Sequence, residues 1–510
     1  MYIRLKFAAL LGVSAACHAQ QKDKIPAKLP NIIFILADDL GYGDIGCYGQ
    51  QKIETPNIDA LADHGIRFLQ QYAGSPVSAP SRCVLLTGKH TGHATIRGND
   101  EWASRGKVDD YKAMLADSTL EGQRPLLDDD IIFPQFLKKA GYTNAIVGKW
   151  GLGAPNTNSI PNKKGFDFFY GYNCQRQAHT YYPVFLYENE HRVYLGNDTV
   201  APHNPLEKGA DPYNLDSYKK YTLKNYSPDL MFNKITGFIN ENKQHPFFLY
   251  WATTIPHVAL QAPKRWIDYY VKKFGDEKPY LGNSGYYPQR YPHAAYAAMI
   301  SYLDEQIGLL IKQLKELGIY ENTIIIFTSD NGPSYAGGAD PQWFNSGGPF
   351  KSELGWGKGF LHEGGIRVPM IVTWPNKIKE KKTTGHISSF QDILPTLCEI
   401  TGTTVPNTTD GISFLPTLLG KKQKEHTYLY WEFFENSGEQ AVRMGKWKGI
   451  RSNIKKGNMK IALFDLENDI TEQKDVSIQY PNIVKQMEQI MLKEHTPAYY
   501  EKFRVKQLGD

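Results

Sequence analysis

A short segment that begins at Ser78 combines a hydroxyl nucleophile with a fixed positive charge. Residues 78–88 (SAPSRCVLLTG) start with a turn rich in serine and proline and continue with a pattern that predicts a helix. We therefore expect Ser78 near the amino end of that helix, where backbone N–H groups and the helix dipole favour an anion. Arg82, one turn further on, is placed to hold an oxyanion. An ordinary capped helix would show the same spacing, so these residues alone leave both interpretations open.

Polar side chains follow several apolar runs of the kind that form buried strands. The residues are Asp38, Asp39, His257, Asp330 and Asn331. In a largely parallel sheet the carboxyl ends of the strands share one edge, and ligands bind beyond that edge. The carboxylate and amide oxygens in this group suit Ca²⁺ or Mg²⁺ rather than zinc. The sequence therefore predicts a ligand site at the carboxyl edge of a sheet.

The elements that must position these side chains alternate between strands and helices. Buried strands are predicted at residues 31–37, 143–147, 246–252, 322–328 and 368–374, and helices at 57–64, 130–140 and 296–317. This alternation predicts an α/β fold, with a large, mostly parallel sheet flanked by helices.

The last ninety residues have a different pattern. Shorter strand-like runs occur at 428–434, 440–451 and 461–465, and a helix is predicted near 482–493. We expect a catalytic domain over residues 28–420 and, over residues 421–510, a smaller C-terminal subdomain with a short antiparallel sheet and one helix.

The first residues have the features of an export signal. Arg4 and Lys6 precede an apolar run at 7–16, which is too short to span a membrane. We expect a signal peptide over residues 1–19 and an exported protein, most simply a periplasmic one. Lipidation of Cys17 is the alternative, although Ser14 stands where a lipoprotein signal usually has a large aliphatic residue.

The Ser78 segment resembles the signature of the formylglycine-dependent (type I) sulfatases, a family of the alkaline phosphatase superfamily. That signature is C/S-x-P-S-R followed by L-x-T-G, and it is matched by Ser78, Pro80, Ser81, Arg82, Leu85, Thr87 and Gly88. The resemblance implies an alkaline-phosphatase-like fold and hydrolysis of a sulfate ester. It also implies that a radical-type maturing enzyme converts Ser78 to formylglycine (3-oxoalanine). The hydrate of that aldehyde carries two hydroxyls on one carbon, so that one attacks sulfur and the other expels sulfate, whereas a plain serine would remain a stable sulfate ester.

Further segments resemble the family pattern and imply roles for their residues. Lys149 in GKWGLG (148–153) and Lys358, which precedes EGGIRVP (363–369), would contact sulfate oxygens, and His257 would act as general acid at the leaving oxygen. The resemblance assigns a calcium ion to the group Asp38, Asp39, Asp330, Asn331 and Ser78. Taken singly, each lysine is equally consistent with a solvated surface charge, and His257 with a structural histidine at a strand end.

The chain departs from the family pattern at Gly151, where the motif usually has a histidine that takes the hydrate proton when sulfate leaves. His179 is our preferred substitute for that base, and His93 is the alternative. A substrate-binding or structural role for His179 is equally open.

Substrate recognition is less clearly encoded. We expect polar contacts with the substrate from Arg97, Asn99, Arg176 and His179, and we expect Gln440 and Arg443 of the C-terminal subdomain to bind the substrate by closing the pocket. Trp251, Tyr181 and Tyr182 are available to stack on a sugar, although aromatic residues are more often part of the core. Resemblance to bacterial sulfatases that act on glycans, over residues 31–155 and 246–375, implies a sulfated galactose or N-acetylhexosamine unit.

Composition excludes some classes of function. The 58 Lys and Arg against 53 Asp and Glu give a net charge of +5 without a dense basic block, which argues against nucleic-acid binding. No other run predicts a membrane span, and five widely spaced cysteines offer no disulfide framework. Two alternatives remain. One is a phosphatase or phosphodiesterase of the same superfamily, which typically binds two zinc ions through histidines; the other is a non-catalytic protein that binds sulfated glycans.

Overall fold

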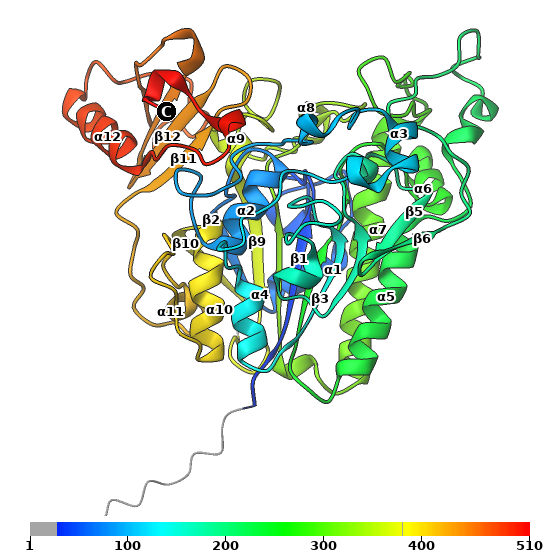
Figure 1. Cartoon of the computed structure of the whole chain (residues 1–510), viewed down its shortest axis with the longest axis horizontal. Coiled ribbons are helices and arrows are strands. Elements are labelled where there is room, and N and C mark those ends of the chain that lie inside the picture. Colours follow the sequence, from blue (N-terminus) through cyan, green and yellow to red (C-terminus); the bar gives the residue numbers. More distant parts are fainter. Residues whose placement is uncertain (1–27, 380) are drawn as a thin grey trace, which may run out of the picture.

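A ten-stranded sheet forms the centre of the protein (Figure 1). The computed structural model describes residues 28–379 and 381–510; the expected signal peptide, with Cys17, lies outside them. The strands of the sheet are β1 (Asn31–Ala37), β2 (Ile66–Tyr72), β3 (Thr143–Lys149), β4 (Phe168–Tyr172), β5 (Phe185–Glu188), β6 (His191–Tyr194), β7 (Phe247–Ala252), β8 (Thr323–Ser329), β9 (Arg367–Thr373) and β10 (Lys382–Ser389). Their order is β10-β2-β9-β8-β1-β7-β3-β4-β5-β6.

The centre of the sheet is parallel, as predicted. Strands β8, β1, β7, β3 and β4 all run in one direction. β9 is antiparallel to both of its neighbours, β2 and β8, and the edge strands β5 and β6 are also antiparallel. A buried apolar run does not reveal its direction, so the reversal of β9 had no signal in the sequence.

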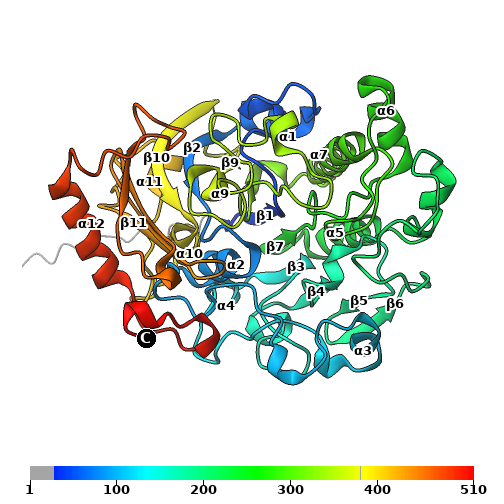
Figure 2. The same ribbon diagram turned by 90° about the horizontal axis from the view of Figure 1, so that it is seen from above.

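Both faces of the sheet are covered by helices (Figure 2), because side chains alternate between the faces along each strand. In β1, Ile33 and Ile35 pack toward one core, and Phe34 and Leu36 toward the other. The first core includes side chains of α1 (Pro56–Asp63), α5 (Ser227–Asn242) and α7 (Pro292–Glu316). The second includes side chains of α2 (Ser78–Thr87), α4 (Phe133–Lys139) and α10 (Ile393–Thr401). No helix in the described ranges is both long and apolar enough to cross a membrane.

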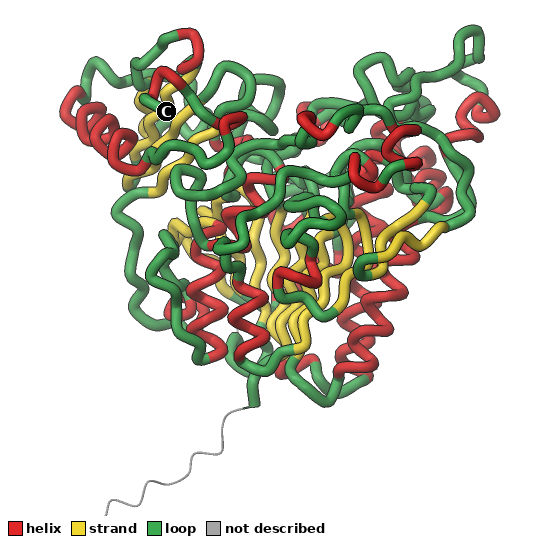
Figure 3. The backbone as a smooth tube through the Cα atoms, in the orientation of Figure 1, coloured by secondary structure: helices red, strands yellow, loops and turns green. Residues whose placement is uncertain are grey.

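A second, four-stranded sheet follows the large one (Figure 3). It is antiparallel and consists of β11 (Leu429–Phe433), β12 (Glu439–Met444), β13 (Trp447–Ser452) and β14 (Ala462–Asp465). The single run expected at 440–451 is a hairpin, because the chain turns at Gly445, where φ is +56°.

The small sheet has two different partners. On one face, α12 (Pro481–Glu494) packs Met487 and Met491 against the sheet. The other face packs against the main domain, where Trp431 lies in one cluster with Val77 and its indole N–H donates to the carbonyl of Ala73 at 3.0 Å. The small sheet therefore supports the backbone that leads into Ser78.

Candidate active site

The carboxyl edge of the large sheet brings together the residues that the sequence singled out. Asp38 and Asp39 follow β1, Asp330 and Asn331 follow β8, Lys149 ends β3, Ser78 begins α2, His257 follows β7 and Lys358 precedes β9. Because β9 runs antiparallel to β8, its start lies at the same edge as the ends of the parallel strands. The reversal of this one strand is what brings Lys358 to the site.

Ser78 contacts a carboxylate and an ammonium group. Its Oγ donates to Asp38 Oδ1 at 3.0 Å. Lys149 Nζ donates to Asp38 Oδ2 at 2.7 Å and to Ser78 Oγ at 3.3 Å. Asn99 Oδ1 accepts from the backbone N–H of Ala79 at 3.1 Å, so the first turn of α2 is held beside these groups.

Arg82 is buried and fully engaged by the protein. Its Nε and one terminal nitrogen donate to Asp330 Oδ2 at 3.1 and 3.0 Å, and the other terminal nitrogen donates to the carbonyl of Lys149 at 3.1 Å. This geometry favours a role in ordering the carboxylates and the end of β3 over direct contact with an oxyanion.

Asn331 and Lys358 hold the second aspartate. Asn331 Nδ2 donates to Asp39 Oδ1 at 2.8 Å and to the carbonyl of Gly332 at 2.9 Å. Lys358 Nζ donates to Asp39 Oδ2 at 2.7 Å. Asn331 Oδ1 is buried and has no hydrogen-bond partner among the described residues. Buried polar atoms without a partner are rare, so we expect a ligand to bind this oxygen.

The oxygen atoms at this edge fit the calcium ion that the resemblance implies. They come from Asp38, Asp39, Asp330 and the unpartnered amide of Asn331, and carboxylate and amide oxygens are ligands that Ca²⁺ prefers. Three carboxylates here face three cationic side chains, those of Arg82, Lys149 and Lys358. A bound divalent cation would make the group positive overall, which suits an anionic substrate.

The surrounding charges shift several pKa values. Burial raises the pKa of Asp38, but Lys149 and the neighbouring cationic groups outweigh it and hold that pKa well below its usual range. Burial, together with the charge of Asp38, raises the pKa of Asp330. Burial and the nearby Lys358 lower the pKa of His257 to about 4, so its ring is neutral at pH 7.

His257 presents a lone pair to this group of residues. Its Nδ1 lies 2.5 Å from the carbonyl oxygen of Val258 and must therefore carry the proton, because a carbonyl can only accept. Its Nε2 is then unprotonated in the neutral ring and lies 3.6 Å from Asp39 Oδ2. Tyr181 donates to the carbonyl of His257 at 2.8 Å and so fixes the backbone rather than stacking on a sugar.

The surroundings of Gly151 disfavour the histidine that the family motif usually has at this position. This glycine has a φ of +71°, and a Cβ atom placed on it would lie 2.9 Å from Cγ of Gln175. A side chain at this position would therefore be strained and would collide with its neighbour. Gln175 fills the space beside Gly151.

Of the two histidines proposed as replacements, only one lies near Ser78 and its partners. His179 stacks on His257, with ring centroids 5.1 Å apart and an interplanar angle of 10°. His93 instead pairs with Asp410 at 2.9 Å, beside Glu494 of the C-terminal subdomain.

Several expected substrate contacts are engaged elsewhere. Arg97 pairs with Glu432 and donates to the carbonyl of Thr496, both at 2.6 Å, and is 3% exposed. Gln440 donates to Tyr430 and accepts from Arg451 inside the small sheet. Neither side chain is free to bind a sugar, because each joins elements of the C-terminal subdomain or links them to the main domain.

Other expected contacts divide between the surface and the core. Arg176 pairs with Asp109 at 2.8 Å on a partly exposed surface. Trp251 is buried on β7 and packs against Phe232, so it belongs to the core. Arg443 donates to Gln70 at 3.0 Å.

Two residues of this region had no signal in the sequence. His203 and Tyr286 lie in long segments without regular pattern, and their rings contact His179, with centroids 5.1 Å away in each case. Long loops carry no periodicity from which such a meeting could be inferred.

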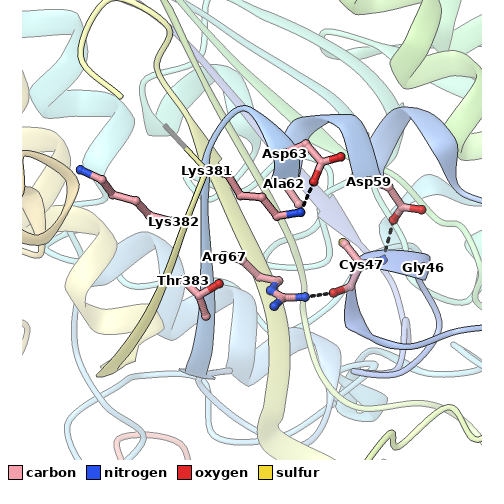
Figure 4. A pocket seen from close by; sticks show the side chains of 9 residues that line it. All are labelled: Gly46, Cys47, Asp59, Ala62, Asp63, Arg67, Lys381, Lys382 and Thr383. Atoms are coloured by element: carbon pink, nitrogen blue, oxygen red, sulfur yellow. Dashed lines mark hydrogen bonds and ion pairs between the residues drawn. The ribbon is translucent and has the colours of Figure 1, made fainter. Parts of the chain in front are cut away.

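A separate hollow of about 190 Å³ lies at the opposite edge of the large sheet (Figure 4). It lies by the amino ends of β2 and β10 and is lined by residues that include Cys47, Arg67 and Lys381. Arg67 donates to the carbonyl of Cys47, and Lys381 pairs with Asp63. This hollow takes no part in the site around Ser78.

Comparisons with known proteins agree with this arrangement. The model of the sulfatase family matches residues 30–403, and that of the N-sulphoglucosamine sulphohydrolase C-terminal region matches residues 352–496. The N-acetylgalactosamine-6-O-sulfatase of Bacteroides thetaiotaomicron is 31% identical over 91% of this chain and 92% of its own length. Human N-acetylgalactosamine-6-sulfatase is 30% identical over 84% of this chain and 74% of its own. The crystal structure of Ps i-CgsB in complex with k-i-k-neocarrahexaose superposes with a TM-score of 0.71 and 27% identity, covering 92% of this chain and 94% of that one. The chain therefore belongs to the sulfatase family and is a sulfuric ester hydrolase.

Proposed function

We propose that the enzyme hydrolyses a sulfate ester on a galactose or N-acetylhexosamine unit of a glycan, using residue 78 after its conversion from serine to formylglycine. The observation that carries the proposal is the contact of Ser78 Oγ with both Asp38 and Lys149 at the amino end of α2. Two relatives named as N-acetylgalactosamine-6-sulfatases make a 6-sulfated hexosamine the first substrate to test.

The residues around Ser78 have distinct tasks in this proposal. Asp38, Asp39, Asp330 and Asn331 would hold calcium. The ion supplies positive charge that polarises a bound sulfate group and lowers the pKa of a nearby hydroxyl. Lys149 and Lys358, each now paired with an aspartate, would turn their ammonium groups toward sulfate oxygens. His257 would protonate the leaving oxygen only after its Nε2, which carries a lone pair in the neutral ring, has taken up a proton.

Biogenesis is part of the proposal. The N-terminal signal supports export, with the periplasm as destination, and the serine at position 78 supports maturation by a radical-type enzyme. A tryptic peptide that contains residue 78 should then be about two mass units lighter than the encoded serine peptide. A peptide of unchanged mass, from protein made together with a maturing enzyme, would support the non-catalytic alternative.

The deciding experiment is sulfate release by matured enzyme in calcium. The panel is galactose, N-acetylgalactosamine and N-acetylglucosamine, each sulfated at one known position. Release from one member identifies the sugar and the linkage. No release from any member, with formylglycine present at residue 78, would contradict action on monosaccharide ends and favour a longer glycan or a binding protein.

Phosphate esters are the competing substrate class. Among the described residues, the group at this edge that could hold a metal ion has a single histidine, His257, beside Asp38 and Asp39. One histidine disfavours the chemistry of the related phosphatases, which bind two zinc ions through several histidines. Rates on matched aryl sulfates and aryl phosphates distinguish a sulfatase from a phosphatase, and faster turnover of the aryl phosphate would favour a phosphatase.

Calcium should stabilise the folded enzyme through Asn331. A ligand that binds only the folded state raises the melting temperature, so we expect added calcium to raise it and a chelator to lower it. Replacing Asn331 by leucine removes the unpartnered Oδ1 and should abolish most of that calcium-dependent rise. A rise equal to that of the wild type in Asn331→Leu would exclude this amide as a ligand.

A further inference from the structure

Three groups from separate loops form a hydrogen-bonded chain beside His257. His179 ends the short 3₁₀ helix Gln177–His179, and its Nδ1 lies 3.0 Å from Nε2 of His203. His203 Nδ1 in turn accepts from the backbone N–H of Tyr286 at 3.0 Å. The three rings also contact one another, with centroid distances of 4.6 to 5.1 Å.

The direction of these hydrogen bonds follows from the backbone group at one end. A backbone N–H can only donate, so His203 Nδ1 must accept and the proton of the neutral ring is on Nε2. That Nε2–H then donates to His179 Nδ1, which leaves the proton of neutral His179 on its own Nε2.

Both rings are neutral around pH 7. Burial, with the neighbouring His257, lowers the pKa of His179 well below its ordinary value. Burial, with Arg176, lowers the pKa of His203. With no extra proton on either ring, only one arrangement of protons satisfies both hydrogen bonds of this group.

The two stacked histidines therefore offer opposite groups to the same site. His257 presents a lone pair at Nε2, because its Nδ1–H is bound by the carbonyl of Val258. His179 presents an N–H at Nε2, which makes no hydrogen bond within the described part of the chain. The expected role of base would need a lone pair at His179 Nε2, and this arrangement opposes it.

We propose that His203 is a positioning residue that fixes His179 as a hydrogen-bond donor toward an oxygen of the substrate. The acceptor is a sugar hydroxyl, an acetamido carbonyl or the ester oxygen, each of which can accept a hydrogen bond from an N–H group. The identity of the acceptor rests on the proposed function, whereas the tautomer of His179 does not.

The backbone around His203 is built for this contact. His203 and Tyr286 have φ of +64° and +63°, and Gly285 has φ of +83°. Left-handed conformations are rare for side chains such as tyrosine and persist where the surroundings hold them. A Cβ on Gly285 would lie 3.1 Å from His203 Nδ1, so glycine lets the turn approach the ring.

The tautomer can be measured directly on the whole enzyme by ¹⁵N NMR of labelled histidines, in which protonated and unprotonated ring nitrogens have well-separated shifts. The His179 signals are those lost in His179→Gln. We expect Nε2 protonated and Nδ1 unprotonated at pH 7. A proton on Nδ1 would overturn the proposal, and this measurement requires no substrate.

A matched pair of variants at position 203 tests the same hydrogen-bonded arrangement by kinetics. His203→Gln keeps an N–H that can donate to His179 Nδ1, whereas the ionised side chain of His203→Glu has a similar shape and can only accept, which favours a proton on Nδ1. We expect kcat/KM of the Glu variant to be about 30-fold lower than that of the Gln variant, the usual effect of losing one strong hydrogen bond. Equal values would overturn the proposal.

The control is the exposed His191 on β6. His191→Gln and His191→Glu should have the same kcat/KM, because this ring lies outside the site. If the wild-type enzyme releases no sulfate from any substrate, the proposed function fails, and the NMR measurement alone still decides the tautomer of His179.

Discussion

Gly151 adopts a left-handed backbone conformation that glycine adopts more easily than histidine does. Restoring the family residue with Gly151→His should therefore destabilise this chain, because its φ of +71° is strained and the new Cβ would meet Gln175 Cγ at 2.9 Å. We expect a loss of about 2 kcal/mol in the free energy of unfolding, measured in urea.

A second substitution, at Gln175, distinguishes steric collision from backbone strain at position 151. Gln175→Gly, added to Gly151→His, removes the colliding side chain and should recover part of the lost stability, whereas Gln175→Gly alone should not stabilise. A Gly151→His variant as stable as the wild type would show that Gln175 moves aside freely and that this contact does not explain the departure from the family pattern.

At the scale of single residues, local sequence predicts position better than it predicts partners. Asp39 and Asn331 were predicted at the site because each follows a buried strand, and the structure brings them together. Arg97 is polar and close in sequence to Asn99, yet it is held by Glu432, more than three hundred residues away. Such long-range ion pairs leave no local pattern from which they could be inferred.

The loop that carries Lys358 leads into the short helix α9 (Glu363–Ile366), which is held by a buried group of charges. Lys448 on β13 pairs with Glu363 at 2.8 Å and with Glu472 at 3.1 Å, and Glu363 begins α9 just before β9. Burial raises the pKa of Glu363, but Lys448 and nearby arginines outweigh it and hold that pKa well below its usual range. The charge of Lys448 therefore stabilises an ionised, buried carboxylate.

Removing the positive charge of Lys448 should strongly destabilise the folded protein. Lys448→Met removes the lysine that pairs with both buried carboxylates. Among the described residues, Glu472 then loses its charged partner and Glu363 keeps Arg367, so we expect a loss of about 3 to 5 kcal/mol in the free energy of unfolding. The control is Lys446→Met, which breaks a partly exposed pair with Asp465 on the same sheet and should cost less than about 1 kcal/mol. Equal losses in urea titrations would contradict the argument.

At the scale of helices and strands, the sequence predicts where the strands lie but not how they pair across the sheet. Apolar runs located every strand that contributes to the centre of the site, because complete burial on both faces leaves a continuous apolar signature. Start points were less well predicted: α4 begins at Phe133 rather than at 130, since Asp130 accepts from the backbone of Leu127 in a turn. The antiparallel direction of β9, which brings Lys358 to the site, depends on pairing across the sheet.

At the scale of the whole molecule, histidines link the main domain to the C-terminal subdomain. His90 and His93 lie in the main domain beside Glu494, the last residue of α12, and Asp410 contacts both rings. The hydrogen bond to Asp410 raises the pKa of His93 above its ordinary value. The charged form of His93 is thus favoured by folding.

This shift gives the link a definite pH dependence. A raised folded pKa contributes stability that is fully present below the unfolded pKa of about 6.5 and is lost as pH rises through the folded value. His93→Gln should therefore destabilise the protein by about 1 kcal/mol at pH 5.5 and by much less at pH 9. His245→Gln, at an exposed ring without a charged partner among the described residues, should show no such difference. Urea titrations at both pH values measure the effect. A loss that is the same at pH 5.5 and pH 9 would mean that His93 supports the subdomain by packing and not by its charge.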